Sequence, residues 1–173
     1  EALRRVYQGE LPFDRTIKIS LTERLSKEQI QARMPHNLKT LDYLLNENHE
    51  AFCQLLSRSA SSQDKTDARL QFMRGRQKAV CLVEELSLRT RRILPLVEQL
   101  EQFAKRMELL QNEIAELKGQ RTNAAKHQRT NLKCELRDLM LLTHETPSSL
   151  RHRCTEIKQR FEHYDEVKQQ LSS

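Results

Sequence analysis

The sequence predicts an all-α protein, an elongated helical bundle of long antiparallel helices that pair as in a coiled coil. Helix breakers are scarce, with three Gly and four Pro among 173 residues, while Leu, Glu, Gln, Lys and Arg, which favour helices, are common. No segment alternates apolar and polar residues with the period of two typical of a half-buried strand. The strongest observation is a heptad repeat of apolar residues in the middle of the chain.

Residues 1–63 are expected to form a connector and short helices that pack at the base of the bundle. Residues 1–8 have the pattern of the last turns of a helix, with Gly9 as its stop signal. The stretch LPFDRTIKIS, residues 11–20, is the least helical part of the chain, and we expect it to be extended. It would lay three apolar side chains onto the helices, those of Phe13, Ile17 and Ile19.

Two helices are expected in the rest of this N-terminal part. Ser26 followed by Gln29 is a capping-box pattern, which marks the start of a short helix. Pro35 is expected to interrupt that helix and to serve as the first residue of the next one. The second helix extends to about Arg58, and the stretch SASSQ, residues 59–63, is expected to be a loop.

Residues 64–173 are expected to form the long antiparallel bundle as a single structural unit. A helical run extends from about Asp64 to Lys118, and Pro95 is expected to bend it or divide it in two. Its second half carries the heptad repeat, in which every core position is apolar, a pattern typical of coiled coils. One core register takes Ile93, Leu100, Met107 and Ile114, and the other takes Leu96, Phe103, Leu110 and Leu117.

A turn at GQRTN, residues 119–123, is expected to lead into two further helices. Thr146 is a candidate N-cap, with Pro147 at the first helical position. Because short turns favour antiparallel neighbours, segments 80–118 and 123–171 are expected to pack together, with Phe103 and Phe161 buried. The apolar positions behind this expectation are Leu132, Leu136, Leu139 and Met140, then Leu150, Cys154, Ile157, Phe161, Tyr164 and Leu171.

No residue pattern is typical of a catalytic, cofactor or metal site. The chain has no Gly-rich phosphate loop and no nucleophile elbow, so we expect no enzyme activity, no cofactor and no small-molecule substrate. His49 and Cys53 are four residues apart and share a helix face, but zinc needs three or four ligands, so no metal is expected. The four cysteines are expected to be free thiols in a reducing cytosol. No apolar run approaches the ~18 residues of a membrane span.

The charge distribution gives the one candidate contact surface. The chain carries 30 Lys and Arg against 24 Asp and Glu, and residues 69–92 hold seven basic residues and two acidic ones. Arginine binds phosphate without reading bases, so this stretch is a candidate for contact with nucleic acid. The alternative is a basic helix face balanced by the acidic stretch 98–116. The candidate contact residues are Arg74, Arg76, Arg89, Arg91 and Arg92.

Four strings along the chain resemble a known family. They are GELPFDRTIKIS, RMPHNLKTL, VCLVEELSLRTRRI and ETPSSLRHR, and they are similar to an insertion-bearing kind of primary sigma factor of bacterial RNA polymerase. The resemblance implies the variable helical segment between the first and second conserved regions. It also implies a cytoplasmic, DNA-binding parent protein that directs promoter recognition and transcription initiation with the polymerase core enzyme and promoter DNA as partners.

The same resemblance implies a role for this segment, but it allows no functional residue of the family to be assigned to this chain. The segment would brace the promoter-melting domain, and the candidate arginines would contact DNA or polymerase. The family's core-binding helix and its promoter-capturing aromatic residues have no counterpart here, so none of those roles is assigned to a residue. The stretch FMRGRQKAV also has a Gly and a Gln where relatives are expected to be richer in Arg.

Both ends of the chain lie inside helical patterns, so we expect it to be a piece of a longer protein. One other class fits the heptads, a coiled-coil adaptor or scaffold that binds another protein along its seam or tip. A continuation resembling Asn-Leu-Arg-Leu-Val-Val in the parent protein would favour the sigma factor, and further heptads would favour the adaptor.

Overall fold

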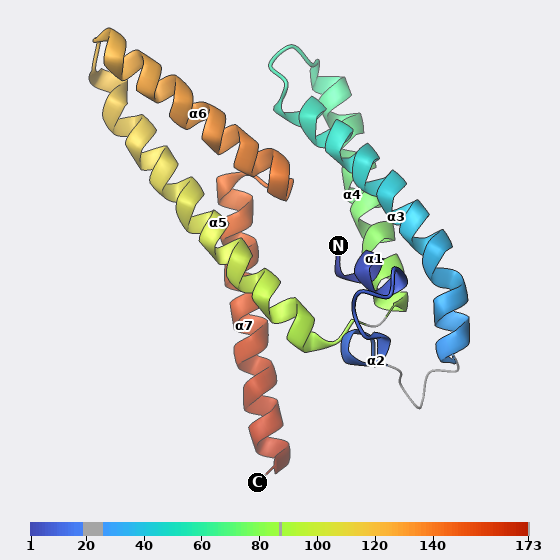
Figure 1. Cartoon of the computed structure of the whole chain (residues 1–173). Helices are drawn as coiled ribbons and strands as arrows, with labels where there is room; N and C mark the ends of the chain where they lie inside the picture. Colours follow the sequence, from blue (N-terminus) through green and yellow to red (C-terminus); the bar gives the residue numbers. More distant parts are fainter. Residues whose placement is uncertain (19–25, 87, 173) are drawn as a thin grey trace. The chain divides into compact units, whose positions relative to one another are not determined.

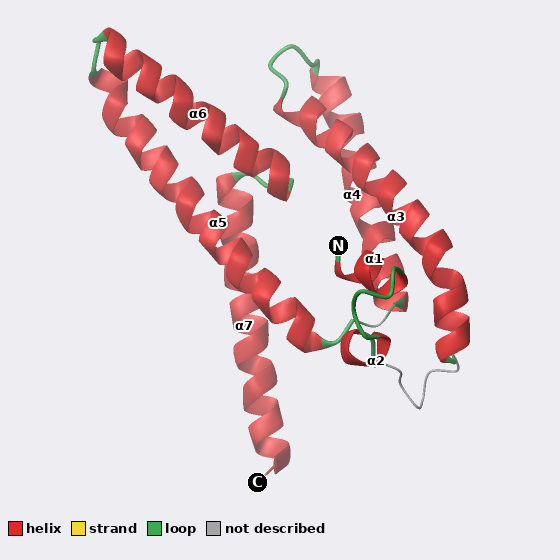
Figure 2. Ribbon diagram, in the orientation of Figure 1, coloured by secondary structure: helices red, strands yellow, loops and turns green. Residues whose placement is uncertain are grey.

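A computed structural model describes residues 1–18, 26–86 and 88–172, without the side chains of residues 90, 91 and 172. All regular elements in these ranges are helices (Figures 1 and 2), apart from an isolated β-bridge between Ile17 and Leu88. The all-α prediction is therefore confirmed. The elements are α1 (Ala2–Tyr7), α2 (Phe13–Thr16), α3 (Lys27–Leu56), α4 (Ser62–Glu85), α5 (Thr90–Glu116), the 3-10 helix η1 (Leu117–Gly119), α6 (Asn123–Thr143) and α7 (Pro147–Ser172).

The chain divides into two compact units, Glu1–Ile93 and Leu94–Ser173. The sequence predicts a boundary near residue 63, with α4 in the bundle that follows. Instead α4 packs against α3 along their lengths, and the two run side by side in opposite directions (Figure 1). The physical reason is the short connection at residues 57–61, which favours an antiparallel pair between the two helices it joins.

The α3–α4 pair is held by a narrow apolar seam. The rings of Phe52 and Phe72 lie with their centroids 5.6 Å apart, and both side chains are buried. Ala51 of α3 and Ala68 of α4 are also buried, and such small side chains let the helix backbones approach. Where the helices meet again, Gly75 of α4 faces the buried side chain of Asn48 of α3.

That contact gives a first stability prediction. A methyl group at position 75 would lie 3.0 Å from Asn48 Cγ and closer still to its oxygen, so Gly75→Ala forces a buried side chain to move. We expect the free energy of unfolding of the α3–α4 pair to fall by about 1–3 kcal/mol, because the steric cost exceeds the gain of about 1 kcal/mol in helix propensity. Hydrogen exchange of the α3 and α4 amides measures this loss of stability. Gly119→Ala is the matched control, because nothing lies within 4 Å of its added methyl. A Gly75→Ala chain with unchanged protection would contradict this account of the crossing.

Local capping signals in α3 behave as expected, but Pro35 does not. The Ser26 hydroxyl accepts from the Gln29 amide at 3.3 Å and the Gln29 side chain accepts from the Ser26 amide at 2.9 Å, which confirms the capping box. Pro35, expected to divide the helix, lies inside a continuous α3. The residues around it explain this, since Ile30 and Met34 are anchored in the core and tertiary packing offsets the local cost.

The first hydrophobic core joins elements that are distant in the sequence. Gly9 has a φ of 79° and follows α1, as its role as a stop signal predicts. Residues 13–16, expected to be extended, form the short helix α2, in which Thr16 Oγ1 donates to the Pro12 carbonyl at 3.0 Å. Ile19 lies outside the described residues. The buried members of this core are Leu3, Val6, Phe13, Ile17, Ile30, Met34 and Leu86.

The expected helix from 64 to 118 is broken, but not at Pro95, which lies inside α5. The chain leaves the helical path between the end of α4 and the start of α5. Leu86 is buried in the first core, Leu88 bridges to Ile17, and the Arg89 amide donates to the Thr16 carbonyl at 2.9 Å. These tertiary contacts satisfy backbone groups that a continuous helix would have paired internally.

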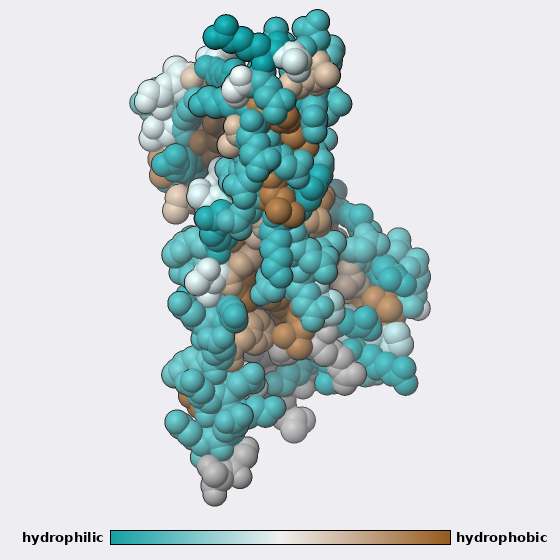
Figure 3. Space-filling model, turned by 90° about the vertical axis from the view of Figure 1, so that its left-hand side faces the viewer, coloured by the Kyte–Doolittle hydropathy of each residue, from teal (hydrophilic) through white to brown (hydrophobic). Residues whose placement is uncertain are grey.

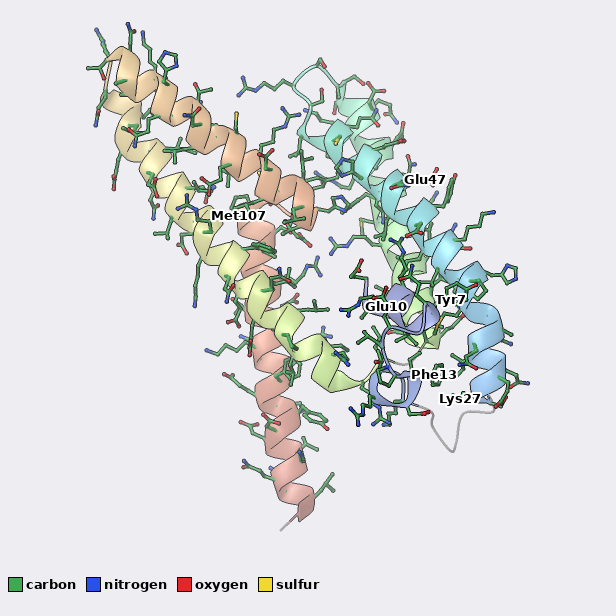
Figure 4. All side chains as sticks on the ribbon, in the orientation of Figure 1. Tyr7, Glu10, Phe13, Lys27, Glu47 and Met107 are labelled. Carbon is green, nitrogen blue, oxygen red and sulfur yellow. The ribbon has the colours of Figure 1, made fainter. Side chains whose placement is uncertain are left out.

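The second unit is built from α5 beyond Leu94, η1, α6 and α7. α5 and α6 run antiparallel about the η1 turn (Figure 1), and the Arg106 guanidinium of α5 binds the Glu135 carboxylate of α6 at 2.7 Å. Met107, labelled in Figure 4, and Leu110 are fully buried. The side chains that complete this core are those of Ala125, Leu132 and Leu150.

Burial along the predicted seam is confined to its middle. Phe103 and Phe161, expected to be buried, are only half-buried. Leu96 is 54% exposed and Leu171 is 84% exposed, although both occupy apolar positions of the pattern. The reason is geometric, since a heptad position is buried only where a neighbouring helix covers it. Figure 3 shows hydrophobic side chains exposed on a face that is otherwise mostly hydrophilic.

The link between α6 and α7 is organised by Glu145, a buried carboxylate. Thr146 caps α7 as expected, since its hydroxyl accepts from the Ser149 amide at 3.3 Å, and Pro147 is the first helical residue. Glu145 accepts a hydrogen bond from Ser149 Oγ and another from Arg153 Nε, the latter at 2.7 Å. His144, with a φ of 50°, ends α6 in the left-handed conformation.

Candidate functional site

The five candidate arginines have separate environments in the structure. Arg89 is used internally, because its Nε donates to the Ile17 carbonyl at 3.2 Å and its amide donates to Thr16. The Arg76 guanidinium lies 5.3 Å from the centre of the Phe72 ring, in cation–π geometry. Arg76 and Arg89 therefore both make contacts within the protein.

The other three differ in exposure. Arg74 is exposed on α4 and lines the groove beside α3. Arg92 is half-buried, and its Nε is buried with no hydrogen-bond partner among the described residues. Arg91 lies in α5, but its side chain is outside the described part of the structure. Arg74 is therefore the one candidate whose described side chain stands open at the surface.

Arg74 and Arg76 lie on different sides of α4. Arg74 and Arg76 differ by about 200° around α4, since each residue turns the helix by about 100°. Arg89 and Arg92 follow the break after α4, and the Arg92 amide donates to the Arg89 carbonyl at 2.8 Å. A contact with phosphate by any of them remains a prediction.

The acidic stretch 98–116 was the alternative partner for these bases. Two of its members pair with cations of their own unit, Glu108 with Arg151 at 3.0 Å and Glu113 with Arg106 at 3.6 Å. The hydrogen bond from Arg106 also lowers the pKa of the Glu135 carboxyl below its ordinary value. These acids and bases are therefore paired within the second unit.

A groove along one side of the α3–α4 pair lies beside Arg74. Tyr43 and Leu44 of α3 line it, and Lys78 and Cys81 of α4 face them. The Tyr43 hydroxyl donates to Glu47 at 2.7 Å, and this hydrogen bond raises the pKa of the tyrosine. Figure 4 labels Glu47 on α3. Acidic and basic side chains mix around the groove, which is typical of a solvated helix face.

Metal binding has one partial candidate. His49 Nε2 lies 3.7 Å from Cys53 Sγ, so the pair does share a face of α3. Within the described ranges, no group of three or more His, Cys, Asp or Glu side chains is placed to hold a metal ion. In the same ranges, no helix combines the length and apolar character that crossing a bilayer requires.

Sequence reasoning overlooked a second basic region, at the turn between α5 and α6. No Asp or Glu occurs between Glu116 and Glu135, whereas five Lys and Arg do. The signal is present in the sequence as a run without acidic residues, although residues 69–92 hold more arginines. This region is exposed at the end of a helical hairpin.

Comparison with protein-family models, with curated proteins and with solved structures finds no match for this chain.

Proposed function

We propose that the chain is the variable helical segment between the first and second conserved regions of a bacterial primary sigma factor. Its parent protein directs RNA polymerase to promoters in the cytoplasm and starts transcription. The segment itself is a helical brace for the promoter-melting domain. One observation carries the proposal. Each string that resembles the family contributes buried side chains where separate elements of the chain meet.

Three of the four strings meet in the first hydrophobic core. GELPFDRTIKIS contributes Phe13 and Ile17, RMPHNLKTL contributes Met34, and VCLVEELSLRTRRI contributes Leu86. The first and third strings are also joined through their backbones, by the Ile17–Leu88 bridge and the hydrogen bond from Arg89 to Thr16. Residues that determine a shared fold are expected at such core positions, so the agreement supports the resemblance.

The fourth string occupies the α6–α7 link. ETPSSLRHR supplies the buried Glu145, the first helical residue Pro147 and the fully buried Leu150. It also supplies Arg153, which binds Glu145. A resemblance confined to solvent-facing residues would carry less weight, because surface positions tolerate most substitutions.

Exposed apolar side chains support the role as a brace. Leu94 and Leu96 near the start of α5 are 44% and 54% exposed, and Val167 and Leu171 near the end of α7 are 39% and 84% exposed. All four belong to the second unit, and contact with another protein surface would remove them from water. In the proposed setting that surface is the promoter-melting domain or the polymerase clamp.

The same exposed residues favour a second candidate, a coiled-coil adaptor that binds another protein along its seam. The two candidates predict different partners. The product of the gene that encodes this chain should be tagged, purified from its own cells and separated from unbound protein. The sigma-factor proposal expects the large polymerase core subunits in stoichiometric amounts, and promoter-dependent initiation when core enzyme is added back. A different stoichiometric partner, with no effect on initiation, would overturn it in favour of the adaptor.

A further inference from the structure

The turn between α5 and α6 contains several basic residues and no acidic ones. Residues 117–134, here called the basic tip, comprise η1 and the first half of α6 and contain no Asp or Glu. Four of the five cationic side chains are exposed and Arg129 is half-buried. The five are Lys118, Arg121, Lys126, Arg129 and Lys133.

These cations differ from three arginines of the same unit that bind acidic partners. Arg106 binds Glu135, Arg151 binds Glu108 and Arg153 binds Glu145. None of the five cations of the basic tip forms an ion pair with any residue that the structure describes. The mutual repulsion of unpaired cations disfavours the compact state, so a cluster of this kind is typical of a surface that meets a polyanion.

The geometry of α6 aligns three of them. Lys126, Arg129 and Lys133 lie within about 60° of one another around the helix, at 100° per residue. From the first to the last they span about 10 Å along the axis, at 1.5 Å per residue. They form a short row of donors along one side of α6, next to the face that buries Leu132.

The N-terminal end of α6 adds to the positive charge of the basic tip. The Thr122 hydroxyl accepts from the Ala125 amide at 3.2 Å and caps α6, a helix of 21 residues that begins within the basic tip. The N-terminal end of a helix carries a partial positive charge and free backbone amides, which favour anions. Helix dipole and side chains therefore attract the same kind of ligand.

We propose that the basic tip binds the phosphate backbone of double-stranded DNA, without base readout. Single strands are disfavoured because residues 117–134 contain no Phe, Tyr or Trp on which bases would stack. An acidic protein is disfavoured because protein interfaces have an apolar or aromatic core. Here Leu132 and Ala125 are buried, and Leu117 is only half-exposed. The inference does not depend on the sigma-factor assignment, since it rests on this chain's own charge and geometry.

The test is titration of the chain with a labelled mixed-sequence DNA duplex of ~30 base pairs, by fluorescence anisotropy over a series of salt concentrations. The variant K126Q/R129Q/K133Q removes the row on α6. We expect the slope of log Kobs against log salt to become shallower by about 2–3, because each lost phosphate contact removes about 0.9. The exchange K126R/R129K/K133R keeps the charges and is expected to restore the parental slope.

Two controls make the result specific. R33Q/K39Q/R58Q removes the same charge from exposed positions of the first unit, and it is expected to leave the slope close to that of the parent. Circular dichroism establishes that each variant remains folded. The proposal is overturned if K126Q/R129Q/K133Q keeps the parental slope. It is also overturned if the slope of the control R33Q/K39Q/R58Q becomes shallower by the same amount. It is also overturned if polyglutamate binds the chain while duplex DNA does not, which would identify an acidic protein as the partner.

Discussion

Replacement of Leu110 by alanine is expected to lower the free energy of unfolding of the second unit by about 2–5 kcal/mol. Leu110 is fully buried in α5, about one helical turn from Met107, which is also fully buried. Truncation to alanine removes three carbon atoms and leaves a cavity that neighbouring helices fill only in part. The loss is large relative to the 5–15 kcal/mol that typically stabilise a domain of about this size.

The neighbouring residue supplies a control that differs in burial alone. Leu109 is 54% exposed, and Leu109→Ala makes the same chemical change in the same helix. It is expected to change stability by less than about 0.5 kcal/mol, as is usual for surface substitutions. Because the chain has two compact units, hydrogen exchange should be followed separately for peptides of 94–172 and of the first unit.

Protection lost in the second unit alone, and only in Leu110→Ala, is the expected pattern. Equal effects of the two substitutions would show that Leu110 is not buried more deeply than Leu109, contrary to the structure. Loss of protection in α3 and α4 as well would show that the two units unfold together.

Replacement of Arg153 by methionine is expected to destabilise the α6–α7 link by about 1–3 kcal/mol, the usual effect of removing a charged hydrogen bond from a buried polar group. Glu145 is 4% exposed, and its carboxylate would lose the hydrogen bond from Arg153 Nε. Methionine retains much of the packing of the arginine stem, so the change tests the charged hydrogen bond more than the contact area.

Arg151 provides the matched comparison two residues away. It also binds a carboxylate, that of Glu108 at 3.0 Å, but both side chains are more than half exposed. Exposed ion pairs contribute about 0–1 kcal/mol, so Arg151→Met is expected to have little effect. A double-mutant cycle with Glu145→Gln measures the coupling to Arg153 directly. If Arg153→Met and Arg151→Met prove equally mild, the burial of Glu145 contributes nothing to the link.

The sequence by itself determined the features that depend on neighbouring residues. Ser26 and Gln29 form their capping box, and Thr146 with Pro147 opens α7, because these signals act within one helical turn. The turn near residues 119–123 and the central heptad positions Met107 and Leu110 were likewise predictable. The basic tip was also visible in advance, as a run without acidic residues.

Tertiary structure decided the features in which distant segments compete. Pro35 and Pro95 are local helix breakers, yet both lie inside helices, whereas the chain breaks between α4 and α5 where no proline occurs. The cause is the burial of Leu86 and the backbone pairing of residues 16–17 with 88–89, contacts between segments some 70 residues apart. Arg89 was read as a surface cation for the same reason. Its carbonyl partner, Ile17, becomes its neighbour only after folding.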